Sequence, residues 1–205
     1  MINLPVTEFV ASLVRGIANW FHYAIGTGSL TNETRAQWAD DFWQFSTALY
    51  AAPKVEAACL SLQDRDGLEV NLALFCLFAA RHHIRFDAPA IQAMRAIGLV
   101  WGHEVVAPLR EARRSLKANM VMKTHVAGNE TVAGLREEVK RVELAAEKAM
   151  QATLVDLFIT IGCRDEAESP TEIAADNFAA WFDEEGIDGE VPRAAVAMLI
   201  HAAFG

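Results

Sequence analysis

The 205-residue chain has few cysteines and few prolines, and its apolar residues form no long run. The longest uninterrupted apolar stretch, Leu72 to Ala80, is about half as long as a membrane-spanning helix needs. No basic segment precedes an apolar stretch at the N-terminus, so we expect neither a secretory signal nor a membrane span. The 3 cysteines are an odd number, and Cys59 and Cys76 sit within apolar helical patterns. Free buried thiols in a reducing cytoplasm are therefore expected, which predicts a cytoplasmic protein.

Positive charge is also scarce, because 18 lysines and arginines face 27 aspartates and glutamates, giving a net charge of −9. From position 163 onward, ten acids against Arg164 and Arg193 give −8. Between Arg110 and Lys123, five basic residues against one acid give +4. The overall sign disfavours general nucleic-acid binding. Attraction between the acidic C-terminal region and the basic segment within one molecule would explain both without a partner.

The composition favours helices, because alanine, leucine, glutamate and arginine dominate and strand-like alternation is nearly absent. A helix that is apolar on every side must be covered on every side. We therefore predict an all-α fold, a single bundle-like domain of about seven or eight helices around a buried central helix at about 68–81. The other helices are expected at about 5–25, 33–51, 53–63, from 88 to a kink or split at Pro108, 109–117, 129–161, from 170 to a turn at 186–189, and 192–204. We expect Asp87 to cap the helix from 88, Ser169 and Glu172 to form a capping box at the helix from 170, and residues 120–128 to form a loop.

The chain divides into three expected parts: an N-terminal amphipathic helix and linker (1–31), a core helical domain (32–162), and an acidic C-terminal helical pair packing on the core (163–205). The helix at 129–161 has an apolar seam at heptad spacing, suited to packing against a partner helix. The seam residues are Val132, Leu135, Val139, Val142, Ala146 and Ala149.

Several strings in the chain occur together in one order: FWQFSTALY from Phe42, VEAACLSLQD from Val55, VNLALFC three residues after Gly67, and VVAPLREARRSLK from Val105. This pattern resembles the proteobacterial proteins catalogued as domain of unknown function 2390, over about 42–150. Glu69 stands where those proteins usually have aspartate, which keeps the carboxylate. The resemblance implies a bacterial cytoplasmic protein and implies no activity.

The first candidate site is a polar cluster beside the central helix, within nine residues of sequence. It consists of Gln63, Asp64, Asp66, Glu69 and Asn71. Carboxylates at a helix N-terminus are able to bind a hard cation such as Mg²⁺. The same residues also make a helix cap, with Asp66 or Gly67 at the helix start, Glu69 in the first turn and Asn71 paired to a neighbouring helix. The spacing does not match the calcium-loop motif.

The second candidate is a basic stripe of Arg110, Arg113, Arg114 and Lys117, which steps by three and four residues along one helix. Such a fork suits a phosphate or carboxylate group of a ligand. It equally suits ion pairs with the polar cluster or with the acidic C-terminal region. Whether the stripe and the cluster face each other is the feature that would separate a ligand pocket from a structural surface.

Other chemistry has little support in the sequence. The two-histidine zinc helix, the Gly-x-Ser-x-Gly elbow, the phosphate loop and the dinucleotide fingerprint are all missing. Thiols in apolar surroundings have raised pKa values and low reactivity, which disfavours Cys59 and Cys76 as nucleophiles. We therefore predict no catalytic residue, metal site or cofactor. Core packing is expected for Trp43 and Trp101, although Trp101 in a ligand pocket would look the same in sequence.

Two functional hypotheses follow, and the sequence leaves open whether the protein is an enzyme. The first is a non-catalytic protein that acts through self-association, as a homo-oligomer, or through a protein partner, because of the heptad seam and the missing motifs. The second is a small-molecule or metal-binding helical protein, including an enzyme on a phosphorylated or isoprenoid-like ligand. It rests on the polar cluster, the basic stripe and Trp101.

Overall fold

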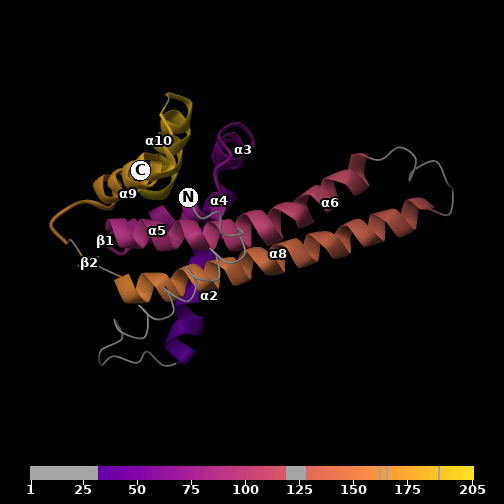
Figure 1. The fold of residues 1–205 in the computed structure, drawn as a ribbon, viewed down its shortest axis with the longest axis horizontal. Helices are drawn as coiled ribbons and strands as arrows, with labels where there is room; N and C mark the ends of the chain where they lie inside the picture. The colour runs from indigo at the N-terminus through magenta and orange to yellow at the C-terminus, as the bar shows by residue number, and fades with distance from the viewer. Residues whose placement is uncertain (1–31, 119–127, 162, 165, 189) are drawn as a thin grey trace, which may run out of the picture.

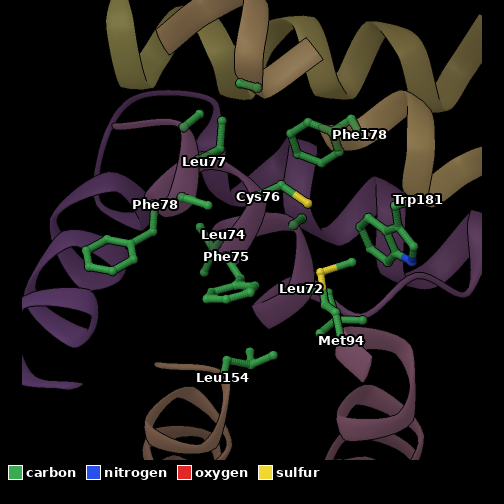
Figure 2. Close-up of a cluster of buried hydrophobic side chains, with 14 of the residues drawn as sticks. Leu72, Leu74, Phe75, Cys76, Leu77, Phe78, Met94, Leu154, Phe178 and Trp181 are labelled. Atoms are coloured by element: carbon green, nitrogen blue, oxygen red, sulfur yellow. The ribbon is translucent and has the colours of Figure 1, made fainter. Parts of the chain in front are cut away.

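The fold is organised around α4 (Val70–Arg81), the helix that the long apolar run predicts. The computed structural model describes residues 32–118, 128–161, 163–164, 166–188 and 190–205. Every residue of α4 from Asn71 to Ala80 is buried, so this helix has no solvent-facing side. Side chains from other helices, among them Met94, Leu154 and Trp181, surround it in the core (Figure 2). The predicted central helix is confirmed.

Two helices precede α4 in the described chain. α2 (Asn32–Tyr50) packs Phe42 against Phe78 of α4, with ring centroids 4.7 Å apart. α3 (Val55–Asp66) ends at Gly67, whose φ of 67° lies in the left-handed region that favours glycine. The predicted end at Gln63 is therefore wrong by about one turn. The backbone of Gly67 closes the helix by donating to the carbonyl of Leu62.

A continuous helical segment follows α4, and its middle part changes hydrogen-bond register. α5 (Ala88–Ile97) is capped by Asp87 as predicted, whose carboxylate accepts from the backbone of Ala90 at 2.9 Å. The π-helix η1 (Gly98–Val106) comes next and leads into α6 (Ala107–Ala118). Pro108 cannot donate a backbone hydrogen bond, and the sequence predicted a kink or a split there. The structure stays helical through Pro108, so the predicted split is wrong; the backbone passes through the wider π register before the proline.

The long helix α8 (Gly128–Ile161) runs antiparallel to α6 (Figure 1). Its C-terminal half packs on α2, α4 and α5, as the buried residues Met150, Leu154 and Leu157 indicate. Its N-terminal part and α6 project side by side away from the other helices (Figure 1). We call residues 107–118 and 128–145 the arm. No residue of α6 is buried, so the arm makes little use of the main core.

The C-terminal helices cover the other side of the core. α9 (Pro170–Glu185) packs on α4, and α10 (Glu190–Phe204) packs on α3 and α9. The predicted capping box is confirmed, because Ser169 and Glu172 bond each other's backbone N–H groups. Asn177 is fully buried and ties α9 to the chain after α4. Its side chain accepts from the backbone of Phe86 at 2.8 Å and donates to the carbonyl of Ile84 at 3.0 Å.

A short antiparallel ribbon joins β1 (Ile84–Arg85) to β2 (Cys163–Arg164). The sequence did not predict it, because strands of two residues are too short to show a period-two pattern. The all-α class is nevertheless confirmed, since the other described elements are helices.

Some predictions fall on residues outside the described part of the chain. These are the N-terminal helix at 5–25 and nearly all of the loop at 120–128. The division into three parts stays a prediction. Among the described helices, none combines the length and apolar character needed to cross a membrane.

Candidate functional site

A cavity of about 1050 Å³ lies between the α3–α4 junction, η1, the start of α6 and the end of α9. Six of the ten predicted site residues line it: Gln63, Asp64, Asp66, Glu69, Arg110 and Arg114. The polar cluster and part of the basic stripe therefore converge on one hollow. Asn71, Trp101, Arg113 and Lys117 are not among its lining residues.

The polar cluster is divided between two helix ends. Gln63, Asp64 and Asp66 occupy the last turn of α3, where the helix turns at Gly67. Glu69 is the N-cap of α4, and its carboxylate accepts from the backbone N–H of Asn71 at 3.3 Å. Glu69 therefore does cap α4, although as the N-cap residue and not, as predicted, within the first turn. The capping interpretation is wrong for Asp66 and Gly67, because both belong to the end of the preceding helix.

Two glycines of η1 let α4 approach closely. A Cβ atom on Gly102 would lie 2.6 Å from Oε2 of Glu69, and one on Gly98 would lie 2.7 Å from Cδ1 of Leu72. Real Cβ atoms do not come so close to other heavy atoms, so both positions need glycine while these side chains stay in place. The spacing of four residues puts both glycines on one side of the helix. The Glu69 carboxylate is therefore held between its own backbone and η1, at the wall of the cavity.

Asn71 lies behind the cavity and is buried, as expected for a residue paired to a neighbouring helix. Its side-chain amide donates to Glu69 at 3.1 Å, and its carbonyl accepts from Gln151 of α8 at 2.9 Å. Oε1 of Gln151 has no hydrogen-bond partner in the described structure. The chain of contacts from α8 through Asn71 fixes the position of Glu69.

Two of the four residues of the basic stripe, Arg110 and Arg113, pair with two glutamates of α8. Arg110 contacts Glu143 at 3.3 Å and Glu147 at 2.9 Å, and Arg113 contacts Glu143 at 3.1 Å. The Glu143 side chain is 7% exposed and that of Arg110 is 12% exposed. Burial raises the pKa of Glu147, and the charge of Arg110 offsets part of that rise. These ion pairs hold α6 against α8.

The other arginines at the cavity pair with its own carboxylates. Arg114 contacts Asp64 at 3.3 Å, and both side chains are about half exposed. The pKa of Asp64 is lowered, first by the hydrogen bond from Gln63 and then by the one from Arg114.

At the α9 end, Arg95 contacts Glu185 at 2.8 Å and Glu184 at 3.2 Å. Each of these guanidinium groups is therefore already neutralised within the molecule.

The cavity is acidic on balance, since six carboxylates line it against three guanidinium groups, a net charge of −3 with histidine neutral. The acids are Asp64, Asp66, Glu69, Glu111, Glu184 and Glu185, and the bases are Arg95, Arg110 and Arg114. In the described structure, Asp66, Glu69 and Glu111 belong to no ion pair, and Oδ2 of Asp66 is buried without a hydrogen-bond partner. Apolar walls come from Leu68, Leu72, Leu99, Trp181 and Ile187.

The glutamates that form ion pairs with the arginines of the basic stripe were not identified from the sequence. Glu143 and Glu147 stand four apart on α8, and Arg110 and Arg113 stand three apart on α6. This matched spacing was a usable signal, because both glutamates stand within one helical turn of Ala146, the buried member of the predicted seam, and an acid at a buried position needs a partner. The acidic C-terminal region pairs instead with Arg85, through Glu168 and Asp176, and with Arg95.

The described part of the chain contains potential metal ligands and two free thiols. Among them, no three or more histidine, cysteine, aspartate or glutamate side chains are grouped so as to hold a metal ion. Burial raises the pKa of the Cys59 thiol to about 12, and burial also raises the pKa of Cys76. Both thiols are protonated at neutral pH and are poor nucleophiles.

One comparison with known proteins returned a match. The model of a family described as "Protein of unknown function (DUF2390)" matches residues 41–154, more than half of the chain. The match spans α3 to α6 and most of α8, and so includes the polar cluster and the basic stripe. No curated protein and no solved structure matches the chain.

Proposed function

Because this chain belongs to a family of proteins of unknown function, DUF2390, we propose its function from the cavity itself: it binds a small cationic ligand there without transforming it. The ligand class is an amine or guanidine group on an apolar skeleton. The observation that supports this most directly is the acidic balance of a cavity with apolar walls. Ligand pockets commonly combine such walls with a few polar groups that orient the ligand.

The position of two aspartates supports the same proposal. Asp64 and Asp66 lie in the last turn of α3, where the negative end of the helix dipole opposes an acidic side chain. Both charges are therefore unfavourable with respect to the dipole of α3, and Asp66 forms no ion pair in the described structure. A cation bound in the cavity would place a positive charge beside the Asp66 carboxylate.

The phosphorylated ligand of the second sequence hypothesis receives less support. Its fork of cationic groups is divided, because Arg113 faces Glu143 and Arg110 is shared between Glu143 and Glu147. Lys117 is exposed and is not part of the cavity lining. Only Arg114 among the stripe faces the cavity without a buried partner, and one guanidinium is a weak site for a diphosphate.

Binding without covalent catalysis is supported by the lining of the cavity. The described lining residues include no serine, threonine, cysteine, tyrosine or lysine. The described lining therefore offers no hydroxyl, thiol or amine nucleophile. The two protonated buried thiols support the expectation of a reducing compartment, the cytoplasm.

The test compares two probes that share an alkyl chain and differ in charge: hexylamine and hexyl phosphate, titrated by isothermal calorimetry. We expect the amine to bind more tightly. Asp66→Asn should weaken amine binding by about tenfold, the equivalent of about 1.4 kcal/mol. Asp41→Asn is the matched control, because Asp41 is exposed on α2, outside the cavity lining. Preference for hexyl phosphate would contradict the proposal and favour the anionic alternative, and no binding of either probe would remove the cavity as the site.

A second candidate function is association through the arm, favoured by the bare side of its longer helix. Of the predicted seam on α8, Leu135 is 52% exposed and Val142 is 46% exposed. Two large apolar side chains seven residues apart, left exposed by the described part of the chain, are suited to a helical partner.

A further inference from the structure

We infer that the arm pairs with the arm of a second copy of this chain, with the two α8 helices antiparallel about an axis near Lys140. This inference rests on the association proposed above and names its occupant and register. It concerns a surface on the far side of α8 from the Arg110–Glu147 contacts and does not involve the cavity.

The first observation is that α2 packs on the C-terminal half of α8 and not on its N-terminal half. α2 packs along one side of the C-terminal half of α8, with Arg35 contacting Asp156 at 3.0 Å and Asp40 contacting Lys148 at 3.3 Å. Val142 lies two heptads before Asp156, so it points to the same side of the helix. α2 provides cover at positions 148 and 156, but in the arm this side of α8 is bare.

The second observation is that the bare side carries both large and small residues. Leu135 and Val142 are large and exposed, whereas Gly134 and Ala145 are small and exposed. A Cβ atom on Gly134 would meet nothing within 4 Å, so the space beside it is open. In an antiparallel pair centred on residue 140, residues equally far from the centre face each other. Leu135 then packs on the partner's Ala145, and large-on-small contacts let two helices approach closely.

The third observation is charge. Glu138 and Arg141 lie on the bare side, are strongly exposed and contact each other within one helix. Such an exposed pair contributes little, so either member is free to exchange partners. In this antiparallel register, each Glu138 faces the partner's Val142 and lies one residue away from the partner's Arg141, whereas a parallel pair would set Glu138 beside Glu138. The charges therefore favour a second copy in the antiparallel orientation over the parallel one.

Pairing with a second copy would also give the arm a buried core, which it does not have on its own. α6 has no buried residue, so the arm is a two-helix projection without a core of its own. A second arm would convert it into a four-helix assembly in which the seam is covered. The contact is confined to a few turns of helix, which is the size range of weak, concentration-dependent association.

The test is sedimentation velocity of the full chain over a concentration series, with charge-reversal variants. We expect a monomer–dimer equilibrium for the unmodified chain. Glu138→Arg and Arg141→Glu should each weaken dimerisation by about tenfold. Each variant places like charges at positions 138 and 141 of the two chains, and the two-fold symmetry repeats this repulsion. An equimolar mixture of the two variants should recover a dimer, since every opposed pair is then of opposite sign. Glu56→Arg is the matched control, because Glu56 is exposed on α3, outside the arm.

The sedimentation results distinguish whether the chain dimerises from whether the dimer has the antiparallel register. A chain that stays monomeric at every concentration would overturn both and would leave another occupant, such as residues 1–31 or a different protein, for the arm. A dimer that both reversals leave unchanged would overturn the register while association stands. Hexylamine binding by Glu138→Arg should match that of the unmodified chain, so the result for the cavity is independent.

Discussion

Glu143 holds two arginines of α6, and its removal makes a sharp test of how the arm is held together. Glu143→Gln keeps the shape of the side chain and deletes its charge. The side chain accepts from Arg110 at 3.3 Å and from Arg113 at 3.1 Å and is 7% exposed. Loss of one member of a buried ion pair leaves the partner charged and poorly solvated.

The expected magnitude follows from the partners. Arg110 keeps Glu147 at 2.9 Å, whereas no other ion-pair partner of Arg113 is described. A hydrogen bond to a charged group contributes roughly 1.5–3 kcal/mol, and Arg113 at 25% exposure recovers part of its solvation. We therefore expect Glu143→Gln to lower the free energy of unfolding by about 3 kcal/mol.

The assay is urea denaturation followed by far-UV circular dichroism, with the slope of the transition checked for constancy. Glu137→Gln is the matched control, because it deletes the same charge from the same helix in an exposed pair with Arg136. This control should change stability by less than about 0.5 kcal/mol. Equal effects of the two variants would refute the argument, since burial would then have no bearing on the strength of the pair.

Two further predictions concern the cavity wall and its pH dependence. Gly102→Ala should displace the Glu69 carboxylate and so weaken hexylamine binding, as measured by calorimetry. The free energy of unfolding from urea denaturation should change by less than about 1 kcal/mol, because the gain in helix propensity offsets the strain at the cap. Unchanged hexylamine binding would show that Glu69 does not contribute to it. The pKa of Glu147 is raised in the folded chain, so this residue's contribution to stability is present below the ordinary glutamate pKa and is lost as the pH rises through the raised value. In urea midpoints measured across that window, the unmodified chain should lose stability relative to Glu147→Gln as the pH rises, and a constant difference would contradict the sign.

Helices could be predicted from the sequence where an apolar run or a capping residue marks them. An unbroken apolar run marked α4, and Asp87 and Ser169 marked helix starts because capping depends on local residues. The end of α3 was misplaced, since Asp64 and Asp66 look like a helix start and only the backbone conformation of Gly67 shows otherwise.

Six residues of the cavity lining could be picked out from the sequence, but the ion pairs among them could not. Gln63, Asp64, Asp66 and Glu69 were found together because they are close in sequence. Which of the arginines would face them depended on the rotation of α6 about its own axis, and that angle has no local signature. The sequence therefore supported an anionic ligand, whereas the contacts with Glu143 and Glu147 leave a cavity that is acidic.

That rotation depends on η1. A residue in an α-helix advances about 100° around the axis, and a π-helix takes up more residues in each turn. The nine residues from Gly98 to Val106 thus set the angular phase between α5, which belongs to the body, and α6, which belongs to the arm. Deleting one residue in this stretch would shift that phase by about 100° without altering any side chain of either helix. Arg110 and Arg114 would then turn away from their present partners, so the length of η1 is a determinant of the site in its own right.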